Sequence, residues 1–184
     1  MKTVKLTTLL TLLLFVTSQI NSQNTDLDTE KQAVIEVMKS YKDAIQNLTT
    51  DGTFELFTED ATIFEQGKVE GTYKEYINGH LGPELGHFKS FTFSDYEIQT
   101  KVNPPYAYTI ENYLYTIVLK GDKTKDTKER TIESKGVATS VLQKIDGNWK
   151  IIHSHTSFKK IKQEANETYL HSEKRYTLIR LQNC

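Results

Sequence analysis

The chain has 184 residues, 23 of them Lys or Arg and 24 of them Asp or Glu, so its formal net charge at pH 7 is −1. It shows no basic stripe of the kind that nucleic-acid binding needs, and we expect no nucleic-acid partner. The single cysteine, Cys184, excludes a disulfide within the chain. The fold must therefore be stabilised by packing, and the length suits one domain with a sizeable core.

The N-terminus has the pattern of a secretion signal, with cleavage predicted after Ser22. Lys2 and Lys5 precede an apolar run at residues 9–16. This run is too short for a membrane-spanning helix, which needs roughly 20 apolar residues. Taking 1–22 as the signal, we predict an exported protein, periplasmic or secreted, with no membrane attachment after cleavage.

A polar linker is predicted at residues 23–28, followed by a helix. Thr29 and Gln32 have the spacing of a capping box, in which side chains satisfy backbone donors at the helix start. Apolar residues then follow the helical period: Val34, Met38, Tyr41, Ile45 and Leu48. We therefore expect one helix from about Thr29 to about Leu48.

Short elements are predicted to follow this helix. Helical pieces are expected at residues 52–57 and 72–78, with a brief strand at residues 61–64 between them. The connection at residues 79–87 contains three glycines and one proline. This composition argues against an unbroken helix, so an irregular segment is expected.

The remainder of the domain is predicted to form four strands at residues 91–102, 106–119, 131–145 and 149–158. The runs are rich in Tyr and β-branched residues, and Asp146-Gly147 is a strong hairpin signal. Helices followed by consecutive hairpin-linked strands predict an α+β domain, with helices packed over one face of a curved antiparallel sheet. Residues 159–184 are predicted to be a tail.

The last predicted strand carries two histidines. Alternation after the turn places Trp149, Ile151, His153 and His155 on one face. Two imidazoles on an otherwise apolar face indicate either the floor of a pocket or a polar patch whose hydrogen bonds are satisfied in the core. Trp149 is expected either beneath the first helix or in the pocket wall.

The strand predicted at residues 106–119 carries four tyrosines. By alternation, Tyr106 and Tyr108 face one way, and Tyr113 and Tyr115 face the other. Packing in the core or at the surface is the default for such residues. The alternative is that one of these hydroxyls lies in a cavity.

Residues 136–157 resemble the closing strands of nuclear transport factor 2-like domains. They are most similar to the SnoaL-like and ketosteroid isomerase-like branch and to the association domain of calcium/calmodulin-dependent kinase II. Residues 64–73 resemble the strand, glycine and short helix that precede the sheet in such proteins. The resemblance covers residues 29–158. It implies a cone-shaped half-barrel that encloses a pocket under the first helix, and a homodimer.

The members of this superfamily include isomerases, cyclases, dehydratases, transport factors and oligomerisation domains, so the fold alone does not supply an activity. The carboxylate base and oxyanion donor of ketosteroid isomerases have no counterparts that can be placed here residue by residue. A purely oligomerising module without a cavity is one alternative.

A metal site is a second hypothesis. A His-x-His pair on a strand can direct two imidazoles toward one point, and imidazole is a common ligand of divalent transition metals. The site requires the glycine-rich connection to fold over the pocket. The candidate ligands are four histidines and one carboxylate: His80, His87, His153, His155 and either Glu65 or Glu84.

The other hypotheses concern an organic ligand. His155 or His153 would act as the acid/base group of a lyase or isomerase, because the pKa of histidine lies near neutral pH. The leading hypothesis is an exported domain that binds a small, largely apolar molecule. Its candidate ligand contacts are Tyr113, Trp149, His80 and His87, and its expected apolar wall is Trp149, Phe91, Phe93 and Leu114.

Overall fold

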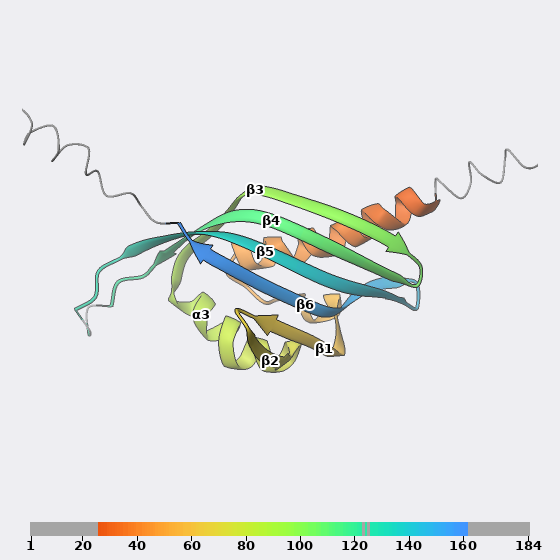
Figure 1. The fold of residues 1–184 in the computed structure, drawn as a ribbon. Helices are drawn as coiled ribbons and strands as arrows, with labels where there is room; N and C mark the ends of the chain where they lie inside the picture. Colours follow the sequence, from red (N-terminus) through yellow and green to blue (C-terminus); the bar gives the residue numbers. More distant parts are fainter. Residues whose placement is uncertain (1–25, 123, 125, 162–184) are drawn as a thin grey trace, which may run out of the picture.

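The computed structural model describes residues 26–122, 124 and 126–161. The predicted signal segment and most of the predicted tail lie outside these residues. A long helix at residues 26–46 lies across one face of a six-stranded sheet (Figure 1). Residues 26–28 are helical, so the predicted linker is wrong at this end. No helix of the described residues is long and apolar enough to cross a membrane.

The remaining elements are, in chain order, η1 (Phe54–Leu56), β1 (Phe57–Glu65), β2 (Lys68–Thr72), α2 (Tyr73–Tyr76), η2 (Ile77–Leu81), α3 (Gly82–His87), β3 (Phe88–Asn103), β4 (Tyr106–Leu119), β5 (Arg130–Ile145) and β6 (Asn148–Lys160). The strand order across the sheet is β2-β1-β6-β5-β4-β3. All neighbouring strands are antiparallel except β1 and β6, which are parallel. The four predicted strands are confirmed, whereas β2 and the parallel pairing were not predicted.

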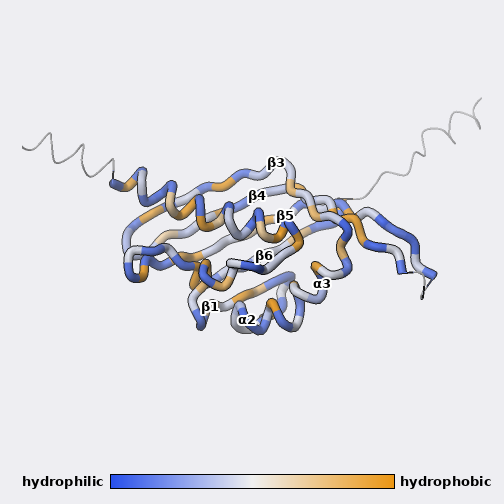
Figure 2. The backbone as a smooth tube through the Cα atoms, turned by 180° about the vertical axis from the view of Figure 1, so that it is seen from behind, coloured by the Kyte–Doolittle hydropathy of each residue, from blue (hydrophilic) through white to orange (hydrophobic). Residues whose placement is uncertain are grey.

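The sheet is curved and unclosed, and the helices cover its inner face, so the predicted α+β cone is confirmed. Hydrophobic and hydrophilic residues alternate along the strands, as expected for elements with one buried face (Figure 2). The pairing of β3 with β4 shifts between Ser94 and Glu97, and Asp95 there has a φ of 48°. Such bulges bend a strand and help the sheet to curve.

The connection at residues 79–87 is helical, which corrects the predicted irregular segment. Here η2 and α3 continue directly from α2. Pro83 lies at the start of α3, directly after the π-helical turn in which the Gly82 N–H donates to the carbonyl oxygen of Ile77. Gly82 lies close to the preceding turn, since a Cβ there would be 2.5 Å from the carbonyl oxygen of Ile77. The glycine and the proline are thus accommodated where the π-helical turn η2 meets α3, and they do not end the helix.

The core lies between the long helix and the inner face of the sheet. Val34 and Met38 of the helix pack in one cluster with Leu142 and Ile151 of the sheet. Trp149 belongs to the same cluster and is 5% exposed. It therefore lies beneath the first helix, as one of the two sequence-based alternatives expected.

A β-bulge in β6 changes which of its side chains face the core. In the pairing of β5 with β6, Leu142 lies opposite Ile151 and Val141 lies opposite His153, so Ile152 is an extra residue. One extra residue reverses the alternation of faces beyond it. The strict alternation assumed from the sequence therefore fails after Ile151.

The prediction that His153 and His155 share a face with Trp149 is wrong. Both histidines lie beside outward-facing residues of β1. Thr62 Oγ1 is 2.7 Å from His153 Nδ1, and the rings of Phe64 and His153 are 5.2 Å apart. The inner face beyond the bulge carries Ser154, Thr156, Phe158 and Lys160 instead.

Candidate functional site

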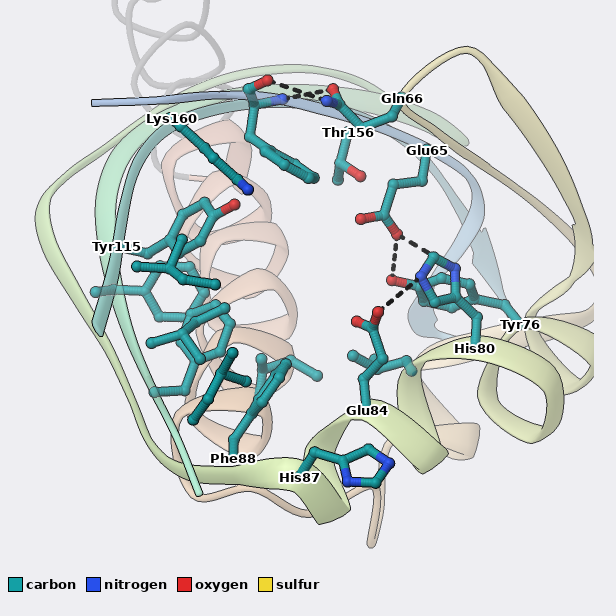
Figure 3. A pocket seen from close by; sticks show the side chains of 18 of the residues that line it. Glu65, Gln66, Tyr76, His80, Glu84, His87, Phe88, Tyr115, Thr156 and Lys160 are labelled. Carbon is teal, nitrogen blue, oxygen red and sulfur yellow. Dashed lines mark hydrogen bonds and ion pairs between the residues drawn. The ribbon is translucent and has the colours of Figure 1, made fainter. Parts of the chain in front are cut away.

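A cavity of about 1360 Å³ lies between the inner face of the sheet and the helical segment formed by α2, η2 and α3 (Figure 3). This volume exceeds the roughly 300–1,000 Å³ of common small-molecule sites. One wall of the cavity is aromatic, and another carries carboxylates and a histidine.

The aromatic wall is built from the inner faces of β3, β4 and β6: Phe88, Phe91, Phe93, Tyr113, Tyr115 and Phe158. The ring of Phe91 stacks on that of Tyr115 with centroids 5.3 Å apart, and Phe93 meets Tyr113 edge-on at 5.1 Å. Burial raises the pKa of Tyr113 and of Tyr115, so both hydroxyls remain protonated at neutral pH and can donate hydrogen bonds.

Gly136 provides the space for the Tyr113 ring. The two residues are paired across β4 and β5, and a Cβ at Gly136 would lie 2.2 Å from Cε2 of Tyr113. No side chain fits at this distance, so the glycine permits the tyrosine ring to lie flat over the sheet. This part of the aromatic wall can take its position only because residue 136 has no side chain.

The polar wall is centred on His80. Its Nδ1 is 3.1 Å from Glu70 Oε1 and 3.9 Å from Glu65 Oε2, and its Nε2 is 3.3 Å from Glu84 Oε1. The Tyr76 hydroxyl donates a hydrogen bond of 2.7 Å to Glu65 Oε2, and burial raises the pKa of this tyrosine. Both ring nitrogens of His80 therefore face carboxylate oxygens.

Glu70 is held in its charged form by a neighbouring lysine. Lys68 Nζ donates a hydrogen bond of 2.8 Å to Glu70 Oε2, and this bond lowers the pKa of the carboxyl group. On the other side, His80 Nδ1 lies 3.1 Å from Glu70 Oε1, and this contact lowers the pKa of the carboxyl group further. Glu70 thus acts mainly as a fixed negative charge beside the imidazole.

Comparison with known proteins identifies the family. Residues 34–160 match the SnoaL-like domain. The chain belongs to the SnoaL-like family. This family includes small-molecule-binding domains as well as isomerases and dehydratases. No curated protein matches the chain.

Solved structures similar to this SnoaL-like domain cover most of its described part. A nuclear transport factor 2-like superfamily protein from Salmonella enterica serovar Typhimurium is 19% identical, with a TM-score of 0.58 over 76% of this chain and 96% of that one. A protein provisionally named a ketosteroid isomerase, from Shewanella frigidimarina, is 28% identical, with a TM-score of 0.53 over 66% of this chain and 92% of that one. A protein provisionally named a scytalone dehydratase, from Novosphingobium aromaticivorans, is 18% identical, with a TM-score of 0.57 over 75% of this chain and 89% of that one. The resemblance to the nuclear transport factor 2-like superfamily is thereby confirmed.

The cavity of the SnoaL-like domain contains part of the site expected from the sequence. Its lining includes Tyr113, His80 and His87, together with both proposed carboxylates, Glu65 and Glu84. His87 lies at the edge of the cavity, beyond Glu84 (Figure 3). The helical connection does fold against the cavity, which is what the metal hypothesis required of it.

The other expected residues lie elsewhere. His153 and His155 are on the outer face of the sheet, so the four histidines do not come together. Within the described part of the chain, no group of three or more His, Cys, Asp or Glu side chains is arranged to hold a metal ion. Trp149 is not in the cavity lining. It lies beneath the long helix, where its Nε1 donates to Glu30 Oε2 at 2.7 Å. Leu114 is also outside the lining, since it alternates with the inward-facing Tyr113.

The residues of the cavity that were not among the site candidates predicted from the sequence include Glu70, Tyr76, Tyr115 and Lys160. Tyr115 carried a signal, because alternation placed it on the same face as Tyr113. Lys160 lies beyond the predicted end of its strand, and Glu70 belongs to a strand that was not predicted. Their places in the cavity depend on pairing between distant segments.

Proposed function

We propose that this SnoaL-like domain binds a small, largely apolar molecule in the cavity of the cone. The observation that supports this function best is the presence of an aromatic wall and a clustered polar wall in one cavity (Figure 3). Ligand sites are commonly concave and mostly apolar, with a few polar groups that orient the bound molecule.

The aromatic wall supports this proposal because its rings are not all enclosed in the core. Phe91, Phe93 and Phe158 are only partly buried and line the cavity. Apolar surface left open to water forgoes roughly 25 cal/mol per Å² of stabilisation. A bound apolar molecule would recover part of that energy.

We expect Phe91→Ala to weaken binding of the neutral fluorescent probe N-phenylnaphthylamine about tenfold, which is about 1.4 kcal/mol. The reason is the loss of a ring that stacks on Tyr115 in the wall. Fluorescence titration measures the affinity, and circular dichroism checks that the variant is folded. The matched control is Tyr108→Ala, because Tyr108 is 47% exposed on the opposite face of the sheet. If Tyr108→Ala loses binding, or if Phe91→Ala binds the probe as tightly as the unchanged protein, the probe lies outside the cavity.

A second candidate function is proton transfer of the lyase or isomerase type. The observation that favours it is the position of His80 in the cavity wall, with carboxylate oxygens near both ring nitrogens. An imidazole held in this way suits general acid/base catalysis. In this proposal His80 takes the role that the sequence suggested for His155 or His153.

For this second function we expect turnover of a β,γ-unsaturated ketosteroid to its conjugated isomer, followed by ultraviolet absorbance. General acid/base groups contribute about 10²–10⁴-fold to rate, so His80→Gln should lower kcat by at least about 100-fold. His87→Gln at the cavity edge is the control and should change kcat little. Turnover that survives in His80→Gln contradicts the assigned role, and absence of turnover in the unchanged protein favours binding alone.

A further inference from the structure

One row across the inner face of the sheet carries two hydroxyls and an amine. Phe93 pairs with Tyr115, Tyr115 with Ser134, and Ser134 with Lys160. Neighbouring strands are about 4.8 Å apart, so these side chains start from adjacent positions on three strands. The amine of Lys160 points into the cavity beside the Tyr115 hydroxyl (Figure 3). None of these three polar residues belongs to the wall around His80.

The Ser134 hydroxyl is fully buried in this row. Its exposed fraction is 0%, and it forms a side-chain hydrogen bond with the Tyr115 hydroxyl, which partly offsets the larger effect of burial on the pKa of this tyrosine. Ser134 is not part of the cavity lining, but its place beside Tyr115 lets it orient the tyrosine hydroxyl that does line the cavity.

Basic residues gather at this end of the cavity. Its lining near the hairpin that joins β4 to β5 includes one carboxylate, Asp122, and four basic residues: Lys120, Lys128, Arg130 and Lys160. Lys120 donates to the carbonyl oxygen of Gly86 at 2.9 Å. Arg130 and Lys160, in contrast, form no ion pair with any described residue. Positive charge is therefore available at this end of the cavity.

The opposite end carries carboxylates that already have partners. Glu65 accepts a hydrogen bond from Tyr76, Glu70 accepts one from Lys68, and Glu84 lies against His80. A ligand cation would have to compete with these contacts. A ligand anion at the basic end would not, and a charge-assisted hydrogen bond to an amine is roughly twice as strong as a neutral one.

We infer that the molecule bound in this cavity is an amphipathic organic anion. Its apolar body lies along the aromatic wall, and its acidic group is held by Lys160 and the Tyr115 hydroxyl, with Arg130 adding to the positive field. The inference rests on the proposed binding function and names the class of ligand. The carboxylate-rich wall around His80 then repels the acidic group, so the ligand binds in one orientation only.

Two probes that differ in a single group test this inference. Anilinonaphthalene sulfonate and N-phenylnaphthylamine share one aromatic skeleton, and only the first carries a sulfonate. We expect the unchanged protein to bind the sulfonate more tightly. Lys160→Gln should weaken the sulfonate about tenfold and leave the neutral probe within about twofold, because only the anion contacts the amine. Unchanged binding of the neutral probe also shows that this variant is folded.

Lys159→Gln is the matched control, since it removes the same charge from the next residue, whose side chain lies on the outer face. An equal loss of sulfonate binding in both variants would overturn the inference, because it would show that the overall positive charge of this region attracts the sulfonate without a specific contact to Lys160. Equal affinity for both probes, unaffected by Lys160→Gln, would overturn the anionic class and leave the binding function standing. Failure of the neutral probe to bind the unchanged protein would overturn the proposed function itself.

Discussion

Gly136→Val is expected to destabilise the domain by about 1–3 kcal/mol and to abolish binding of N-phenylnaphthylamine. Any Cβ at this position would lie 2.2 Å from Cε2 and 2.8 Å from Cζ of Tyr113. The tyrosine ring is also confined by Phe93, whose centroid is 5.1 Å away, and by Tyr96 at 6.3 Å. The ring must therefore swing into the cavity, where it would occupy the volume of a ligand.

Urea unfolding and probe titration measure the two effects of Gly136→Val. The loss of stability is a net value, because valine has a higher strand propensity than glycine and offsets part of the clash. Thr139→Val, exposed on the outer face of the same strand, controls for that propensity. In a Tyr113→Ala background the clash is absent, so Gly136→Val should cost much less. An undiminished cost there would show that the tyrosine ring is not the cause.

Glu30→Ala is expected to lower the free energy of unfolding at neutral pH by about 1–3 kcal/mol, because it leaves a buried donor unsatisfied. Trp149 is 5% exposed, and its Nε1 donates to Glu30 Oε2 at 2.7 Å. The other carboxylate oxygen of Glu30 accepts from Lys144. One carboxylate thus joins the long helix to two strands of the sheet.

The effect of Glu30 should depend on pH. The hydrogen bonds from Lys144 and Trp149 hold the pKa of Glu30 below its ordinary value. Between the folded and unfolded pKa values the unfolded chain binds more protons, so this contribution is complete above the unfolded pKa. It is lost as the pH falls through the folded pKa. The unchanged protein and Glu30→Gln should therefore converge in stability in acid.

Chemical unfolding from neutral pH down to about pH 3 measures this convergence. Glu36→Ala is the matched control, because Glu36 is exposed on the same helix. A constant difference between the unchanged protein and Glu30→Gln at every pH would contradict the role of the charge. An equal loss in Glu36→Ala would indicate a general effect on the helix.

The strands that alternate without interruption could be predicted from the sequence. The predicted strand at residues 106–119 has the bounds of β4 (Tyr106–Leu119). Its faces are confirmed as well, with Tyr113 and Tyr115 in the cavity lining and Tyr108 exposed on the other side. Alternation suffices there because every residue of β4 is paired in register with β5.

The helical segment beside the cavity could not be predicted in the same way. Glycine and proline usually end helices, and the sequence contains three glycines and one proline at residues 79–87. The helix persists because Pro83 lies in a first turn and because its apolar side, with Leu81 and Leu85, is buried in the core. Burial of this kind overrides local propensity and brings His80 against Glu70, a pair that no spacing in the sequence indicated.

The sequence by itself determined the α+β class, the four-stranded meander, the superfamily and the residues that form its aromatic strand. Tertiary structure alone decided which histidines enter the cavity. Ile152 looks like any alternating residue, and only the register with β5 makes it a bulge that turns His153 and His155 outward. Register is a property of two strands together, and one extra residue reverses every face beyond it. Of the four histidines proposed from the sequence, His80 and His87 therefore line the cavity, whereas His153 and His155 do not.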